Sequence, residues 1–337
     1  MAIVFFRFCP LAKTMDLTAV TLTELRYLVA LADTGHFGRA AAKCFVTQPT
    51  LSTQLKKLEN NLGVQLVERD PRCARLTAVG HQVVAHARVI LEHVQAIGDV
   101  ARGQSDPLSG EFHLGVIPTL GPYLLPQLLG PLQKKLPQLR LAVVEQLTAA
   151  LVDELLAHRL DAALLALPVE EEGLEALELF EEPFWVLAPR RHPLARRKTV
   201  SEDELEHQPV LLLAEGHCLR EQTLAVCGKS QPEATADFRA SSLETLRHLV
   251  SAGYGCTLIP ELAVPRLRDP GTVVRPLIGE HAFRRIGIVW RRSYPRAEAV
   301  VTLGHFIREQ ALRGGMGSMR SSAAPQPEAA PAAKQAR

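Results

Sequence analysis

Residues 22–80, LTELRYLVALADTGHFGRAAAKCFVTQPTLSTQLKKLENNLGVQLVERDPRCARLTAVG, decide the fold of the first part of the chain. Leu22, Leu25, Leu28 and Ala32 recur at helical spacing, and Gly35 ends the pattern. HFGRAAAKCFV then predicts a short, alanine-rich second helix.

The third predicted helix, TQPTLSTQLKKLENNLG, contains its own start and stop signals. Thr47 can cap its first turn, Pro49 stands where a missing N–H costs nothing, and Gly63 can end it. Because this basic helix follows two short ones, the segment predicts a helix-turn-helix. The basic residues on both sides of Asp70-Pro71 predict a small β-hairpin, the wing.

The outer face of the third helix is the candidate DNA-reading surface. Leu51, Leu55 and Leu58 should pack inward, which leaves hydroxyls and amides outside for base edges and phosphates. A polar face that only meets solvent would give the same pattern. The candidate DNA-binding residues, with lysines and wing arginines for the backbone, are Thr47, Gln48, Pro49, Thr50, Thr53, Gln54, Lys56, Lys57, Arg69, Arg72 and Arg75.

The charge of the chain is concentrated in this region. Residues 39–75 contain seven Lys/Arg and three acids, a local charge of +4, whereas the whole chain carries +2. A polyanionic partner should therefore bind here.

Beyond the wing the pattern changes twice. Residues 77–102 have a long apolar stripe without a core of their own, which predicts a dimerisation helix. After QSDPLSG, strand-like and helical runs alternate from GEFHLGVI to DAALLAL, and FWVLAPRRHPLA, PVLLLAE and CTLIPELAV are further strand-like runs. This alternation predicts a parallel, doubly wound α/β sheet. About 200 residues can hold two such subdomains with a ligand cleft between them.

Composition excludes several classes of protein. Of 337 residues 47% are apolar and 22% charged, as expected for a soluble protein with sizeable cores. No apolar run reaches the roughly 18 residues of a membrane helix, and the start of the chain does not have the form of a signal peptide. A solute-binding protein is therefore not expected, and the predicted location is the cytoplasm.

Six cysteines in a chain of this length do not form a disulfide scaffold. In GHCLREQTLAVC, Cys218 and Cys227 stand nine residues apart, with His217 and Arg220 beside the first. A cation and a helix N-terminus both favour the thiolate, the form that attacks a peroxide O–O bond. Alternatively, Cys218 is a small apolar residue near a loop histidine. A zinc site of His217, Cys218 and Cys227 would lack closely spaced ligand pairs.

Residues 22–80 closely resemble the winged helix-turn-helix of LysR-type transcription regulators, notably in GRAAAKCFVTQPTLS, LENNLGVQLVER and LTAVG. The resemblance implies dimers or tetramers joined through the linker helix. It also implies an effector domain of the periplasmic-binding-protein type, in agreement with the α/β alternation.

Four other segments, GHCLREQTLAVC, FRASSLETLRHLVSAGYG, IPELAVP and GVIPTLGPYLLPQL, resemble the peroxide-sensing subgroup of that family. This resemblance implies that Cys218 reacts with peroxide and that Cys227 resolves it as a disulfide. It further implies a peroxide pocket of Thr119, Thr148, His217 and Arg284, with Arg285 as the alternative to Arg284. The segment GKSQPEATAD departs from the subgroup. Cys9, Cys44, Cys73 and Cys256 have no assigned partner; Cys256 is expected in the core and Cys44 within the helix-turn-helix.

We therefore predict a peroxide-activated DNA-binding regulator of oxidative-stress genes, not an enzyme, with no cofactor and no metal. Its expected partners are double-stranded DNA, hydrogen peroxide, RNA polymerase, a thiol reductant such as glutaredoxin or thioredoxin, and further copies of itself. A LysR-type regulator for a small organic acid and a thiol peroxidase are the alternatives. The predicted domains are an unstructured extension at 1–20, a winged helix-turn-helix at 21–78, a linker helix at 79–107, an effector domain at 108–313 and an unstructured tail at 314–337.

Overall fold

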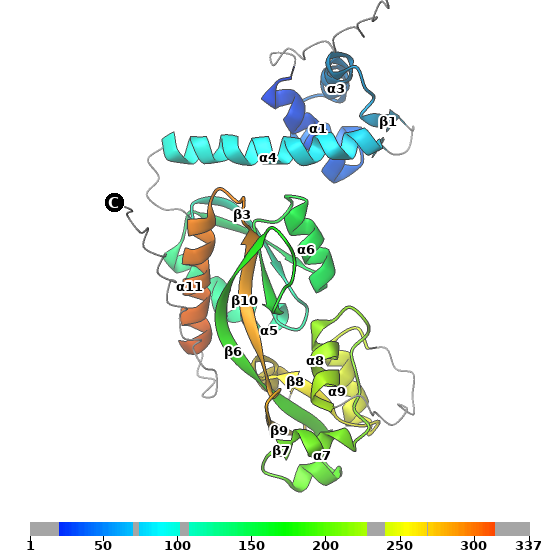
Figure 1. Ribbon diagram of the computed structural model, residues 1–337, viewed down its shortest axis with the longest axis vertical. Helices are drawn as coiled ribbons and strands as arrows, with labels where there is room; N and C mark the ends of the chain where they lie inside the picture. Colours follow the sequence, from blue (N-terminus) through cyan, green and yellow to red (C-terminus); the bar gives the residue numbers. More distant parts are fainter. Residues whose placement is uncertain (1–19, 70–73, 102–107, 228–239, 268, 314–337) are drawn as a thin grey trace, which may run out of the picture. The chain divides into compact units, whose positions relative to one another are not determined.

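The computed structural model describes residues 20–69, 74–101, 108–227, 240–267 and 269–313 (Figure 1). They belong to two compact units, which divide after Gln104. The predicted tail, nearly all of the predicted extension, Cys9, Cys73, Arg72 and the segment GKSQPEATAD lie outside the described residues.

The first unit contains the three predicted short helices, α1 (Leu22–Thr34), α2 (Phe37–Lys43) and α3 (Gln48–Leu62). Their ends follow from local chemistry. The Thr21 side chain accepts a hydrogen bond from the Glu24 amide, and the Glu24 carboxylate accepts one from the Thr21 amide, which makes a capping box. Thr47 caps α3, and Gly63 ends that helix at φ 69°, a left-handed conformation that suits glycine. The predicted cap at Thr47 and the predicted stop at Gly63 are confirmed.

The predicted wing is present as β1 (Val67–Arg69) and β2 (Ala74–Leu76), which pair antiparallel. The core of the unit consists of leucines and alanines from all three helices, and Cys44 is buried among them as predicted. Val20 is partly buried against this core. Val20 is the last residue of the predicted unstructured extension, and an apolar residue that precedes a helix cap can cover the open end of the helix in this way.

The predicted linker helix is α4 (Ala78–Ala101). Its apolar stripe divides into two parts. Val84 and Ala87 are buried within the unit, whereas Ile90, Val94 and Ile97 are exposed to 43%, 38% and 67%. An exposed apolar stripe of this kind suits a second helix, so dimerisation through α4 stays a prediction.

The second unit contains an eight-stranded sheet in the order β4-β3-β5-β10-β6-β9-β7, with β8 paired to β6 (Figure 1). Its elements in chain order are β3 (Gly110–Val116), α5 (Gly121–Lys135), β4 (Leu139–Glu145), α6 (Thr148–Leu156), β5 (Ala162–Leu167), β6 (Leu174–Pro189), η2 (Pro193–Arg196), β7 (Val200–Ser201), α7 (Glu202–Glu206), α8 (Cys218–Cys227), α9 (Leu243–Ser251), β8 (Thr257–Pro260), η3 (Glu261–Ala263), α10 (Val264–Leu267), β9 (Thr272–Ile278), β10 (Phe283–Arg291) and α11 (Ala297–Arg313).

The predicted α/β architecture is present, but the sheet is not purely parallel. β3 pairs parallel with β4 and β5, and β7 pairs parallel with β9. β10 pairs antiparallel with both β5 and β6, and β6 pairs antiparallel with β8 and β9. The run PVLLLAE forms only isolated bridges at Val210 and Leu213. The prediction of parallel pairing is correct for β3, β4 and β5 and wrong for β6, β8 and β10, because apolar runs do not reveal strand direction.

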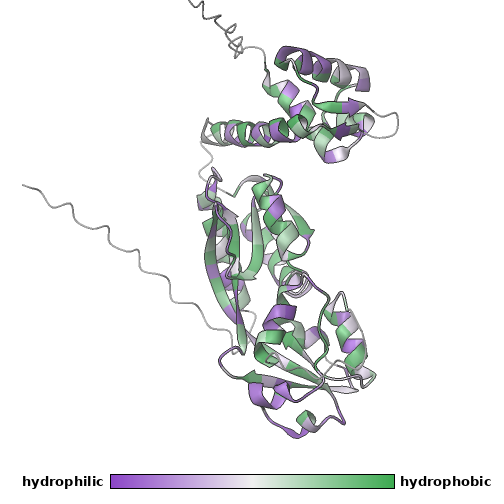
Figure 2. Cartoon of the chain, turned by 45° about the vertical axis from the view of Figure 1, so that its right-hand side comes forward, coloured by the Kyte–Doolittle hydropathy of each residue, from purple (hydrophilic) through white to green (hydrophobic). Residues whose placement is uncertain are grey.

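The long strand β6 joins two halves of the unit. Its first part pairs with β10 beside the βα units of β3, β4 and β5, and its second part pairs with β8 and β9. Figure 2 shows that the strands of this sheet are largely hydrophobic, as expected where helices cover the faces. None of the described helices has the length and apolar character that crossing a lipid bilayer requires.

Candidate functional site

The candidate DNA-reading face of α3 is exposed. Thr47, Gln48, Pro49, Thr50 and Thr53 are exposed, and Gln54 is half-buried. On the opposite face, Leu51, Leu55 and Leu58 are buried, as predicted. The helix therefore presents its polar N-terminal half to the surroundings, in the arrangement that a recognition helix needs.

Three basic side chains of α3 and the wing are exposed, and one of them has a partner within the unit. Lys56 and Arg75 are exposed. Lys57 is also exposed, but its Nζ lies 3.5 Å from Oε1 of the buried Glu24. Lys57 thus has a structural partner besides any phosphate. Arg72 and the side chain of Arg69 lie outside the described residues.

The two candidate redox cysteines are the first and last residues of one helix, α8. Cys218 is half-buried and Cys227 is fully buried. No disulfide joins them. A helix of ten residues keeps its ends about 13.5 Å apart along the axis, whereas a disulfide needs Cα atoms within roughly 4.4–6.8 Å. The segment LREQTLAV is therefore helical and holds the two thiols apart.

The loop before α8 positions Cys218 against the first half of the unit. Gly216 has φ 89°, and a Cβ at this position would lie 3.0 Å from Cδ1 of Leu147. Both the positive φ and this close approach require glycine. Leu147 precedes Thr148, the first residue of α6. The starts of α6 and α8 are therefore neighbours.

His217 does not supply the positive charge that the sequence suggested. Burial lowers the pKa of its imidazole below the ordinary 6.5, so the ring is neutral at neutral pH. Arg220 directs Nη1 to the carbonyl oxygen of Leu213, at 2.9 Å. The burial of its side chain favours the uncharged form of His217. Arg220, which keeps its charge while it donates to a carbonyl, and the helix N-terminus remain as sources of positive potential near Cys218.

Several polar atoms around this helix start are buried and lack a hydrogen-bond partner among the described residues. They are Nδ1 of His217, Oγ1 of Thr148, and Oε1 of Gln146 and Gln222. Buried polar atoms normally have partners, so a group of such atoms suits a small polar ligand. Gln146 and Gln222 were not predicted. Gln222 follows Cys218 by four residues, so helical spacing alone places both on one face.

Arg284 and Thr119 form a buried network with Glu182. The guanidinium donates from Nε to Glu182 Oε2 at 2.8 Å, from Nη1 to Thr119 Oγ1 at 2.9 Å, and from Nη2 to the Thr119 carbonyl at 3.0 Å. The other Glu182 oxygen accepts from the Leu262 amide at 2.9 Å. Hydrogen bonds on both charges offset the cost of burying them. Arg285, the alternative to Arg284, is exposed.

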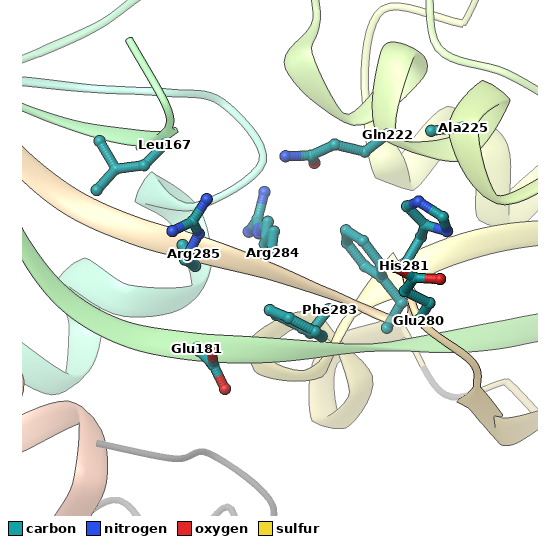
Figure 3. A pocket seen from close by; sticks show the side chains of 10 residues that line it. Leu167, Glu181, Gln222, Ala225, Glu280, His281, Phe283, Arg284 and Arg285 are labelled. Atoms are coloured by element: carbon teal, nitrogen blue, oxygen red, sulfur yellow. The ribbon is translucent and has the colours of Figure 1, made fainter. Parts of the chain in front are cut away.

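A cavity of about 330 Å³ connects this network with the cysteine helix (Figure 3). Gln222 and Ala225 of α8 lie on one side, and Arg284 and Arg285 of β10 lie on another. Glu181, Leu167, Phe184, Glu280, His281 and Phe283 complete the lining.

The four predicted pocket residues therefore fall into two pairs. Thr119 and Arg284 are hydrogen-bonded to each other. Thr148 begins α6 and His217 lies in the loop before α8, each next to the point where Leu147 approaches Gly216. Gln222, one helical turn after Cys218, borders the cavity that Arg284 also lines.

Known protein families match both units of the chain. Residues 22–81 match the family model of the bacterial regulatory helix-turn-helix protein, lysR family, and residues 105–312 match the LysR substrate binding domain. The chain belongs to the LysR family. A LysR relative from Dickeya chrysanthemi, the hydrogen peroxide-inducible genes activator, is 41% identical over 86% of this chain and 95% of its own.

Solved LysR structures extend the similarity to both units. A cysteine-to-aspartate variant of full-length OxyR from Pseudomonas aeruginosa matches with a TM-score of 0.75 and 42% identity, over 86% of this chain and 95% of its own. A cysteine-to-serine variant of OxyR from Corynebacterium glutamicum, with H2O2 bound, matches with a TM-score of 0.61 and 36% identity, over 87% of this chain and 93% of its own.

Proposed function

We propose that this chain is a DNA-binding transcription activator that hydrogen peroxide switches on through Cys218 and Cys227. The observation that carries the proposal is α8. One helix has a cysteine at each end, and near its first turn lie polar atoms that have no hydrogen-bond partner in the described part of the chain. The similar regulators named for hydrogen peroxide support the same effector.

The proposed chemistry has two steps. The Cys218 thiolate attacks one oxygen of H2O2, the S–O bond forms as the O–O bond breaks, and hydroxide leaves with a proton as water. The Cys227 thiolate then attacks the sulfenic sulfur, the S–S bond forms, and the second oxygen leaves as water. Two thiols and one peroxide thus give one disulfide and two waters.

The polar atoms around Cys218 have distinct roles in this proposal. The Oγ1 of Thr148 and Nδ1 of His217 bind and orient the peroxide. A neutral imidazole can accept the peroxide proton or donate its own to the leaving oxygen. Arg284 is already bonded to Glu182 and Thr119, so we assign it the positioning of Thr119 rather than direct attack chemistry.

The output is a change in DNA binding. α3 and the wing bind an operator, α4 joins copies of the chain into a dimer or tetramer, and RNA polymerase responds to the rearranged complex. A dithiol reductant such as glutaredoxin or thioredoxin returns the disulfide to thiols. These partners, and a reducing cytoplasm as the location, belong to the proposal.

The test compares the DNase footprint and operator affinity of the full chain before and after addition of hydrogen peroxide, with mass spectrometry of the 218–227 peptide. A changed footprint together with the disulfide supports the proposal. An unchanged footprint in the presence of the disulfide contradicts it. Sustained consumption of peroxide with a thiol reductant would instead favour a thiol peroxidase.

The cavity beside Arg284 and Arg285 supports a second candidate, a LysR regulator for a small organic acid. Its volume of about 330 Å³ and its cationic side suit a small carboxylate. A carboxylate that changes the footprint of the fully reduced protein, while peroxide changes nothing, would establish this alternative.

A further inference from the structure

The turn between α2 and α3 holds a residue that its backbone does not favour. The amide of Phe45 donates to the carbonyl of Ala42 at 3.1 Å, and the amide of Val46 donates to the carbonyl of Ala41 at 3.0 Å. These two bonds are the Schellman motif that ends many helices. The motif places Phe45 at φ 60°, in the left-handed region. Glycine, and less often asparagine, normally occupies that position.

The Phe45 side chain does not offset this backbone strain by burial. It is 96% exposed, whereas Ile97, the next most exposed large apolar residue in the described part of the chain, is exposed to 67%. Val46, the next residue, is partly buried against the core. The turn therefore anchors itself through Val46 and presents Phe45 outward. An unfavourable backbone conformation without a packing gain points to function.

The position of Phe45 identifies what it would contact. It lies two residues before Thr47, the cap of α3, and Thr47, Gln48 and Thr50 are exposed as Phe45 is. A ring at the start of a recognition helix is placed at the edge of the major groove. The apolar group available there is the C5-methyl of thymine.

We propose that Phe45 is a specificity residue whose ring packs on a thymine methyl group next to the bases that α3 contacts. This inference rests on the proposed DNA binding. It identifies DNA, rather than a second copy of the chain or residues 1–19, as the surface that covers the ring, because the ring adjoins the recognition face.

The test uses a duplex that the wild-type full chain selects from a random-sequence library, and copies in which single thymines are replaced by deoxyuridine, which lacks only the methyl. Affinity is measured by fluorescence anisotropy at fixed salt for wild type, Phe45→Asn, Phe45→Gly and Phe45→Tyr. Asn and Gly suit the left-handed backbone, and Tyr keeps the ring. Thermal unfolding of each variant is measured in parallel.

We expect deoxyuridine at the contacted position of one half-site to weaken wild-type binding about fourfold, as loss of one buried methyl does, and in both half-sites about sixteenfold. Phe45→Asn, which removes the ring from both copies in a dimer, should lose about sixteenfold on the thymine duplex and nothing more on the duplex with both replacements. Phe45→Tyr should bind as wild type. The melting temperature of Phe45→Asn and Phe45→Gly should equal or exceed that of wild type.

Three results would overturn the inference. In the first, Phe45→Asn binds the thymine duplex as tightly as wild type does. In the second, deoxyuridine weakens the binding of Phe45→Asn as much as that of wild type, which would mean that the ring and the methyl group do not interact. A melting temperature that falls in Phe45→Asn, but not when residues 2–19 are also deleted, would mean that the chain's own N-terminal segment covers the ring. If the wild-type chain selects no duplex at all, the proposed DNA binding fails, which is a different outcome.

Discussion

Cys218 and Cys227 cannot form a disulfide while α8 keeps them about 13.5 Å apart, so the proposed switch requires α8 to melt. A substitution that weakens this helix should therefore make the cysteine pair easier to oxidise. Ala225→Gly is the perturbation. Ala225 is an exposed residue of α8, two positions before its end at Cys227. Glycine there lowers the stability of the helix and adds no cost to a melted segment.

The magnitude follows from helix propensity. Replacing alanine by glycine costs a helix about 1 kcal/mol. Only the reduced form contains α8 in this proposal, so the equilibrium between thiols and disulfide shifts about fivefold toward the disulfide. For a two-electron couple about 1.4 kcal/mol corresponds to 30 mV, and the midpoint potential of the Cys218–Cys227 pair should become about 20 mV more negative.

The assay equilibrates the protein in glutathione or dithiothreitol redox buffers, traps thiols by alkylation, and measures the oxidised fraction by mass spectrometry. Gln133→Gly is the matched control. Gln133 is exposed and stands two positions before the end of α5 at Lys135, a helix that the switch leaves intact. Gln133→Gly should lower the melting temperature of the protein without a change in the midpoint potential of the Cys218–Cys227 pair. A potential for Ala225→Gly that is unchanged, or less negative, would refute the melting of α8.

Three further predictions concern the thiols, the DNA face and pH. Cys218→Ser should abolish the peroxide response, whereas Cys227→Ser should still form a sulfenic acid, detectable with dimedone, without the switched footprint; a normal response in Cys227→Ser would contradict the pairing. Thr50→Ala should weaken binding to the selected duplex more than to random DNA, and equal losses would leave it with backbone contacts only. Lys57→Ala should weaken binding to all DNA and reduce the salt slope by about one unit, with a slightly lower melting temperature because the cation beside Glu24 is lost. Burial lowers the pKa of His217 below 6.5. Between the lowered pKa and 6.5 the unfolded chain binds a proton that the folded chain does not, so the free energy of unfolding should fall as pH falls through about 6.5. His217→Gln should flatten this slope in urea titrations, and an unaltered slope would show that His217 does not cause it.

Local chemistry explains which parts of the fold could be predicted from the sequence. The bounds of α3 follow from Thr47 and Gly63, whose effects act within one helical turn. The helical state of α8 follows similarly from residues between the two cysteines. Cys256 was expected in the core, and it is fully buried; burial, with the neighbouring Cys227, raises the pKa of its thiol to about 12.

The parts that could not be predicted depend on contacts between distant residues. Glu182 and Arg284 are 102 residues apart, and they meet because β6 and β10 pair antiparallel. Nothing in the local pattern of either strand indicates that direction. The role of Gln146 likewise could not be predicted. Its Oε1, which has no partner among the described residues, belongs to the site only because the start of α6 lies next to the loop before α8.

The same network limits where the switch can act. Arg284 and Glu182 stand on the two long strands, Thr119 follows β3 in one half of the unit, and Leu262 lies in the other half. Removing one partner of a buried ion pair costs roughly 3–5 kcal/mol, several times the propensity cost of about 1 kcal/mol worked out for α8. This network, which connects the two halves of the unit, should therefore keep its contacts in both redox states. What oxidation changes is the surface around α8, and so the signal to DNA should pass through contacts that this surface makes with another copy of the chain rather than through bending of the two halves.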